Sequence, residues 1–189
     1  ISCAGVFETL DKGATWSPRN RGLQADFLPD PNAEVGQDPH LLVACDSNFD
    51  VMWQQNHCGI FRTSDGGKNW EDISDKGGEA DFGFAIAADP KDDQVAWVVP
   101  ALSDGIRVAI DRSVCVCRTE NGGKSWDTFR KGLPQGQAFD ITYRHALDQD
   151  EETLVFGTTT GNLYISYDHG ESWKSLSHNL PMVHCVEFV

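Results

Sequence analysis

The sequence predicts an all-β fold, a β-propeller made of four-stranded antiparallel blades. Two observations lead to this prediction. A short motif recurs four times, and apolar runs of strand length alternate with Asp-rich turns between its copies. Each copy ends in a tryptophan, and these tryptophans recur about every 50 residues, the length of one propeller blade with its loops.

The motif itself explains why these residue types recur. Its shared form is Ser/Thr, any, Asp, any, Gly, any, Thr/Ser, Trp, and its copies are Thr9–Trp16, Thr63–Trp70, Thr119–Trp126 and Ser166–Trp173. An Asp followed two residues later by Gly, between apolar runs, predicts a tight hairpin. The carboxylate can accept hydrogen bonds from the backbone amides of the turn. Burial of a tryptophan under the turn contributes roughly 4–6 kcal/mol of gross hydrophobic stabilisation. We therefore expect structural roles for Asp11, Trp16, Asp65, Trp70, Asn121, Trp126, Asp168 and Trp173.

The four copies resemble the Asp-box, or bacterial neuraminidase repeat, of propellers such as sialidases, oligoxyloglucan-type glycosidases, sortilin and photosystem assembly factors. The wider segments CAGVFETLDKGATW, WQQNHCGIFRTSDGGKNW and FGTTTGNLYISYDHGESW are similar to a bacterial group described as glycosyl hydrolases with Asp-box repeats. The resemblance covers essentially the whole chain. It implies the fold and points to a glycosidase, although the same box serves unrelated functions.

The segments between the boxes divide the chain into blades. Paired strands are expected at 41–45 with 51–55, at 84–88 with 94–99, and at 141–146 with 153–157, and no helix longer than a turn is expected. The predicted units are a partial blade 1–40, in which Ile1 already lies on a strand, blades 41–80, 81–134 and 135–181, and the first strand of another blade at 182–189. Such a set does not close a ring. We therefore expect an incomplete arc whose open edges favour self-association, and the resemblance implies that it is the C-terminal half of a larger propeller.

Composition excludes several classes of partner. Lys and Arg total 15 against 29 Asp and Glu, a net charge of -14, which repels nucleic-acid phosphates and anionic membrane surfaces. No signal peptide is visible, so a cytoplasmic location is favoured over secretion, while the start at Ile1 leaves a removed leader open. Six scattered cysteines without zinc-ligand spacing favour buried free thiols over disulfides, and neither a metal nor another cofactor is expected.

Three aspartates are the candidate catalytic residues. Asp26 and Asp81 each lie in an Ala-Asp-Phe segment, and Asp140 follows Phe139, at comparable places after their boxes. The loops that carry them lead into the strand lining the propeller axis. In a glycosidase, Asp26 and Asp81 would divide the roles of general acid and base, with Asp140 as the next candidate. The alternative is that all three are turn carboxylates or strand caps.

Polar side chains on two further segments are candidates for ligand binding. The run 54–58 is expected to be a loop suited to sugar hydroxyls, and 101–113 a flap over the same face. The candidates are Arg21, Gln55, Asn56, His57, Asp104 and Arg107. The three arginines and Tyr/Glu pair of a sialidase cannot be placed, and the acidity disfavours an anionic substrate. Two functions remain: a glycosidase-like propeller acting on or binding neutral carbohydrate, and a non-catalytic module that binds protein or glycan.

Overall fold

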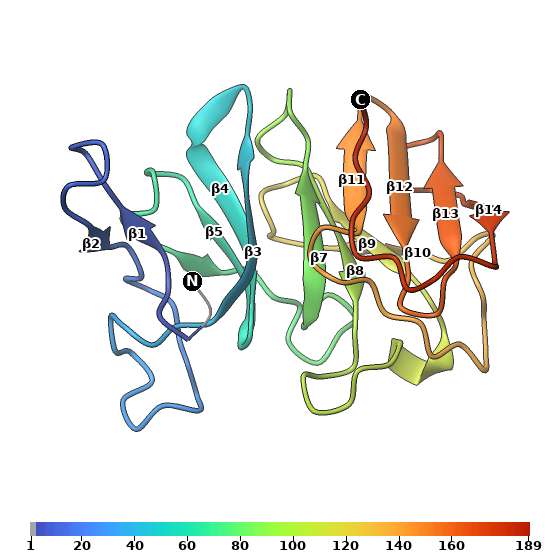
Figure 1. The fold of residues 1–189 in the computed structure, drawn as a ribbon, viewed down its shortest axis with the longest axis horizontal. Helices are drawn as coiled ribbons and strands as arrows, with labels where there is room; N and C mark the ends of the chain where they lie inside the picture. The colour runs from blue at the N-terminus through green and yellow to red at the C-terminus, as the bar shows by residue number, and fades with distance from the viewer. Residues whose placement is uncertain (1–2) are drawn as a thin grey trace.

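The computed structural model describes residues 3–189 and is built from β-strands (Figure 1). Three four-stranded antiparallel sheets stand side by side, and a two-stranded hairpin precedes them. Helical structure in this part of the chain is limited to one 3-10 turn, Ile110–Arg112. The prediction of four-stranded antiparallel blades in a partial propeller is confirmed. No helix among residues 3–189 is long and apolar enough to cross a membrane.

Each sheet adds its strands in chain order, so neighbouring strands are joined by hairpins. The preceding hairpin pairs β1 (Phe7–Glu8) with β2 (Ser17–Pro18). The first sheet contains β3 (Pro39–Cys45), β4 (Asn48–Asn56), β5 (Gly59–Thr63) and β6 (Glu71–Asp72). The second contains β7 (Gly83–Ala88), β8 (Ala96–Pro100), β9 (Val116–Thr119) and β10 (Asp127–Phe129). The third contains β11 (Leu147–Asp150), β12 (Thr153–Gly157), β13 (Leu163–Ser166) and β14 (Lys174–Ser177).

The core lies between the faces of adjacent sheets. The first strands of the sheets are neighbours, since β7 contacts both β3 and β11 (Figure 1). Between the first two sheets, Trp53 and Ile60 share a buried cluster with Val98. Between the second and third, Trp97 is buried with Phe156. Each sheet therefore depends on its neighbours for burial of its apolar faces.

In each four-stranded sheet the box forms the hairpin between the third and fourth strands, and the first box joins β1 to β2. In the second box, Asp65 Oδ1 accepts the Asn69 backbone N–H at 2.9 Å, and Asp65 Oδ2 accepts Asn69 Nδ2 at 2.7 Å. Thr63 Oγ1 accepts the Gly67 N–H at 3.1 Å and donates to Asp65 Oδ1 at 2.8 Å. The side-chain bond from Asn69 is the main cause that lowers the pKa of Asp65 to about 2.

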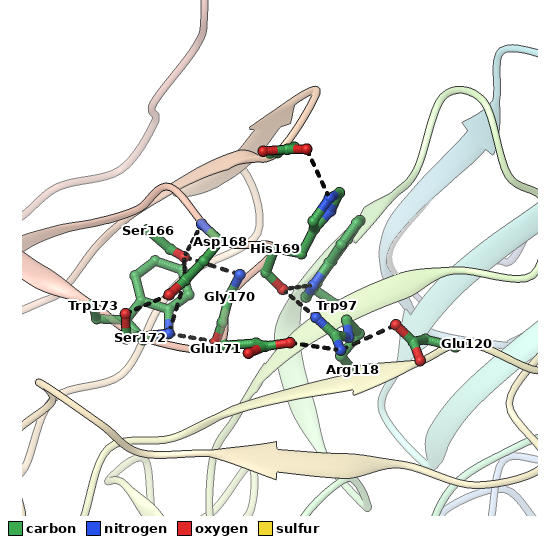
Figure 2. A network of polar contacts seen from close by, with 11 residues as sticks. Trp97, Arg118, Glu120, Ser166, Asp168, His169, Gly170, Glu171, Ser172 and Trp173 are labelled. Carbon is green, nitrogen blue, oxygen red and sulfur yellow. Dashed lines mark hydrogen bonds and ion pairs between the residues drawn. The ribbon is translucent and has the colours of Figure 1, made fainter.

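The fourth box also docks on the second sheet through its turn (Figure 2). The carbonyl of His169 accepts Trp97 Nε1 and Arg118 Nη1, both at 2.9 Å. Arg118 reaches Glu120 at 3.0 Å and Glu171 at 3.6 Å, so one nearly buried guanidinium links two sheets. The His169 backbone is left-handed, with φ of 52°, and the equivalent Lys12, Gly66 and Gly122 share this conformation.

Two of the box tryptophans, Trp70 and Trp126, bind through the indole N–H to the segment that follows the preceding box, whereas Trp173 Nε1 donates to Gly170 of its own box at 3.0 Å. Trp70 Nε1 donates to the Arg19 carbonyl at 2.8 Å, and Trp126 Nε1 donates to the Ile73 carbonyl at 2.9 Å. Trp70 and Trp173 are 4% exposed, whereas Trp16 is 60% exposed. The expectation that each tryptophan is buried is therefore wrong for Trp16. Its ring lies near Gly13 of its own turn, but no preceding unit among residues 3–189 covers it.

Other strand predictions also need correction. Segment 141–146 is a loop, and the strand begins at Leu147, because Ile141 packs into a separate cluster with Phe84 and the hairpin turns tightly at Glu151 with φ of 49°. Segment 182–189 contains no strand. It makes one parallel bridge, between Cys185 and His145. The prediction that Ile1 begins a strand lies outside the described residues.

Candidate functional site

The connections between sheets gather at one end of the arc, opposite the box hairpins. In Figure 1 the loops around residues 24–36 and 101–112 extend from its lower edge. Between β6 and β7, Asp75 and Ala80 close a turn by a 2.9 Å backbone bond. We call this end the loop face. Its loops differ from one another in sequence, whereas the opposite end repeats one motif.

Two bulges place aromatic side chains at this face. The pairing of β3 with β4 shifts between Pro39 and Leu41, and the pairing of β7 with β8 shifts between Gly83 and Ala85. The extra residues are His40 and Phe84, and bulges are a common way to redirect a side chain. Their rings stack with centroids 4.6 Å apart and an interplanar angle of 22°.

The stack continues into the third unit and forms an aromatic row of His40, Phe82, Phe84 and Tyr143. Tyr143 contacts Phe84 edge to face at 5.3 Å, and Phe82 contacts Phe84 in the same way at 5.3 Å. Arg107 lies over Phe84 at 5.2 Å. The row therefore runs across all three units, with His40 and Phe84 buried and Phe82 and Tyr143 partly exposed.

Beside this row lies a cleft of about 360 Å³, lined by residues of three connections. Its lining includes His57, Cys58, Asp81, Phe82, Ser103 and Asp104. The structure thus brings together Asp81, His57 and Asp104, three of the residues singled out from sequence. The carboxylates of the cleft already have cationic partners: Asp81 faces Lys76 at 3.4 Å, and Asp104 binds Arg107 at 2.6 Å.

The other two aspartates lie apart from this arrangement. Asp140 is 7% exposed and its Oδ1 accepts Asn162 Nδ2 at 2.7 Å and the Thr160 hydroxyl. Asp26 is exposed and lies beside the Cys58 thiol at the cleft. Burial is the main cause that raises the pKa of Cys58, and the Asp26 carboxylate adds to it. Asp26 is thus a neighbour of the cleft, and Asp140 is a buried acceptor in the third unit.

Several predicted binding residues occupy other positions than expected. The run 54–56 belongs to β4, so Gln55 and Asn56 are strand residues, both fully buried, and the loop assigned to them is wrong. They are buried because β4 is covered on both sides by neighbouring strands and by the second sheet. Arg21 is exposed, and its backbone carbonyl accepts the backbone N–H of Trp70 at 2.9 Å. Arg107 does lie at the loop face, with its guanidinium 3.5 Å from the Tyr143 hydroxyl.

Sequence analysis missed His40, Phe84 and Tyr143. The available signal was an aromatic or imidazole side chain near the start of each blade, at the first strand for His40 and Phe84 and in the preceding loop for Tyr143, but the bulges at His40 and Phe84 leave no local pattern. It also expected no metal site. Among residues 3–189, two groups have three potential ligand atoms within 4.8 Å of one another: Asp38 with His40 and His57, and Glu79 with Cys115 and Cys117.

Comparison with known proteins supports the architecture. The BNR/Asp-box repeat family model matches residues 164–175, the fourth box. An ancestral GH74 enzyme is similar in structure, with a TM-score of 0.65, 16% identity, and coverage of 94% of this chain and 22% of that protein. The GH74 xyloglucanase from Xanthomonas campestris has a TM-score of 0.61 and 16% identity, with coverage of 93% and 27%.

A third similar structure is YCF48 bound to D1 peptide, with a TM-score of 0.53, 16% identity, and coverage of 77% of this chain and 42% of that one. No curated protein sequence matches the chain. The chain therefore spans less than half the length of each of these structures, and at this identity the likeness establishes the fold alone. Together with the four boxes, these findings identify the chain as a partial β-propeller built from Asp-box blades.

Proposed function

We propose that the loop face binds neutral carbohydrate, as the ligand site of a glycosidase-like propeller. The observation that carries the proposal is the aromatic row beside a cleft with paired charges. The partly exposed rings of Phe82 and Tyr143 offer apolar contact to the C–H groups of a sugar. The side chains of Asp81, Asp104 and Arg107 offer hydrogen bonds to its hydroxyls. The similarity in fold to two GH74 enzymes is consistent with this ligand class.

Hydrolysis would need two carboxyl groups on opposite sides of a glycosidic bond. Asp81 lines the cleft and Asp26 adjoins it through Cys58, so these two remain the first candidates for general acid and base. Asp104, in the same cleft, is the next. Asp140 is the weakest of the group because two hydrogen bonds hold its carboxylate in the third unit.

The test of binding is calorimetric titration of neutral oligosaccharides into the full chain and into Tyr143→Ala. Loss of one ring contact should weaken binding by about 1 kcal/mol, roughly fivefold. Tyr167→Ala is the matched control, because Tyr167 is exposed on the fourth box at the opposite end. Equal affinity of both variants and wild type would refute the site. Hydrolysis by wild type that is lost in Asp81→Asn and Asp26→Asn would assign the acid and base.

A protein ligand is the second candidate, and a specific observation favours it. Apolar side chains are exposed on the loops around the row: Phe27 at 46%, Leu102 at 47%, Ile106 at 57% and Phe139 at 50%. Such a rim is common where proteins dock. Selection of peptides from a displayed library, with loss of binding in Ile106→Asp, would support this role. A failure of every peptide alongside binding of oligosaccharides would exclude it.

The exposed units at the ends of the arc carry a separate expectation of self-association. Within residues 3–189 the β1–β2 hairpin forms a two-stranded sheet of its own, and unpaired strand edges favour contact with other chains. Light scattering at increasing concentration should therefore show a mass above that of the monomer. A constant monomeric mass would refute it.

A further inference from the structure

Three metal-binding side chains meet where β3 begins and β4 ends. Asp38 and His40 flank Pro39, and Pro39 pairs with Asn56, the residue before His57. The backbone continues this pairing, because the His57 N–H donates to the Asp38 carbonyl at 3.0 Å. Cross-strand neighbours share a face, so the side chains of Asp38 and His57 lie together, and His40, at the bulge, has its ring 6.0 Å from that of His57. The hairpin therefore brings one carboxylate and two imidazoles to the same side.

The distances suit a single ion. One ligand atom from each of Asp38, His40 and His57 lies within 4.8 Å of the others. His57 Nδ1 is 3.6 Å from Asp38 Oδ2, and the two imidazole centroids are 6.0 Å apart. Ligand atoms about 2.0–2.2 Å from a tetrahedral zinc ion stand roughly 3.4 Å apart. The His57–Asp38 pair at 3.6 Å is close to this separation, and pairs nearer the 4.8 Å limit would have to move closer on binding.

His40 is already oriented as a ligand. Its Nδ1 is 2.9 Å from the Gly83 carbonyl, which leaves Nε2 as the nitrogen with a free lone pair. A metal-binding histidine commonly uses its second nitrogen in this way. The ring is 7% exposed, so the surrounding side chains fix its position.

The surroundings are those of a built site. Phe84 stacks on His40, Phe82 meets it edge on at 5.6 Å, and Phe27 contacts His57 at 4.9 Å. Behind them, Gln55 is fully buried and neither its amide oxygen nor its amide nitrogen has a hydrogen-bond partner. Its side chain ends beside Gly83, the residue whose carbonyl holds His40. An unpaired buried amide of this kind points to a bound water or ion.

We propose that Asp38, His40 and His57 form a binding site for a divalent transition metal, best suited to zinc. Two imidazoles and one carboxylate are ligands that zinc prefers, and three protein ligands leave it a fourth, exchangeable position. His57 lines the cleft described above, so this position is accessible to a ligand at the loop face. The site stands independently of the carbohydrate proposal, since metal binding can be measured without any sugar.

A second group must be distinguished in the test. Cys115 and Cys117 lie two residues apart with Glu79, and thiolates also bind zinc. The two sites differ in donor atoms. Cobalt bound to imidazole and carboxylate lacks the strong near-ultraviolet charge-transfer band that thiolate ligands produce. Cobalt spectra therefore report which group is occupied.

The experiment titrates zinc into the purified, metal-free full chain by calorimetry and repeats the titration with His57→Gln, Asp38→Asn and His184→Gln. His184→Gln is the control, because it removes an exposed imidazole outside the group. We expect one zinc per wild-type chain, no thiolate band in the cobalt spectrum, and a rise in thermal midpoint on zinc addition. Affinity should fall at least about tenfold in the first two variants, since loss of even an outer-shell partner costs about that much, and remain unchanged in the control.

Other results would overturn the proposal. Equal zinc affinity in wild type, His57→Gln and Asp38→Asn would show that these side chains are not ligands. A thiolate band in the cobalt spectrum of wild type would move the site to Cys115 and Cys117. To separate metal loss from unfolding, the circular dichroism spectrum and metal-free thermal midpoint of each variant must match those of wild type.

Discussion

The first and second boxes have nearly the same hydrogen bonds and very different packing. Asp11 Oδ1 accepts the Thr15 backbone N–H at 2.8 Å, as Asp65 Oδ1 accepts that of Asn69. In both boxes the hydrogen bond from the side chain of that same residue, Thr15 or Asn69, is the main cause that lowers the pKa of the aspartate to about 2. Yet Trp16 is 60% exposed and Trp70 is 4% exposed. The polar part of the box is complete within one hairpin, whereas its apolar part needs the preceding unit.

This difference separates two roles within one motif. The Ser/Thr, Asp and Gly positions set the shape of a turn, and they do so in every copy regardless of its neighbours. The tryptophan joins one unit to the next, through the indole N–H of Trp70 and the Arg19 carbonyl. Substitutions at the two kinds of position should therefore have different costs.

The largest effect is expected from Trp70→Ala. Removal of this buried ring leaves a cavity between two units and an unpaired Arg19 carbonyl, so the free energy of unfolding should fall by about 3–5 kcal/mol. Urea unfolding followed by circular dichroism measures it. An unchanged urea midpoint would mean that the tryptophan does not join the units.

Gly22→Ala should cost about 1–3 kcal/mol. Gly22 has φ of +92°, and a Cβ there would stand 2.1 Å from the Trp70 carbonyl oxygen, so both backbone strain and a clash oppose the change. Gly77→Ala is the matched control, because Gly77 has φ of +79° with no atom within 4 Å of the added carbon. Similar losses in the two variants would show that left-handed strain alone, without the contact to Trp70, sets the cost.

Acid should weaken the boxes that carry aspartate. The folded-state pKa of Asp11 and Asp65 is about 2, below the ordinary 3.8, so their stabilisation is present above about pH 4 and is lost as pH falls toward 2. Asn121 replaces this carboxylate in the third box and donates through Nδ2 to Ser125 at 2.8 Å. Asn121→Asp should make the loss steeper between pH 4 and 2, and Asp168→Asn should make it shallower. Thermal midpoints across that range measure the slopes, and identical slopes would contradict the prediction.

The smallest effect is expected from Trp16→Ala. Because this ring is mostly exposed, its removal should change the free energy of unfolding by less than about 0.5 kcal/mol. Urea unfolding under the conditions used for Trp70→Ala gives a direct comparison. A loss as large as that of Trp70→Ala would show that Trp16 is buried in solution, for instance against a second copy of the chain.

The fold could be predicted from sequence because its signals are local. Asp-x-Gly turns, alternating apolar residues and a recurring tryptophan act within about ten residues of the chain, and the three sheets follow from them. The missed strand at Leu147 reflects competition, since the apolar residues of 141–146 serve a separate cluster with Phe84. The candidate site was less predictable. His40 and Phe84 meet only because two sheets stand side by side with a bulge in each, and no spacing in the chain records that contact.

The bonds of Trp70, Trp126 and Trp173 to the preceding unit make the arc a linear array of nearest-neighbour couplings. Trp70 donates a hydrogen bond to the Arg19 carbonyl, Trp126 to that of Ile73, and the Trp173 backbone N–H to that of Lys131. Every one of these bonds joins consecutive units. The stability of such an array is approximately a sum of unit and interface contributions. Loss of one interface therefore divides the arc at that point into two shorter blocks that unfold separately. The exposed ring of Trp16 is a surface on which another unit could pack, as the preceding unit packs on Trp70.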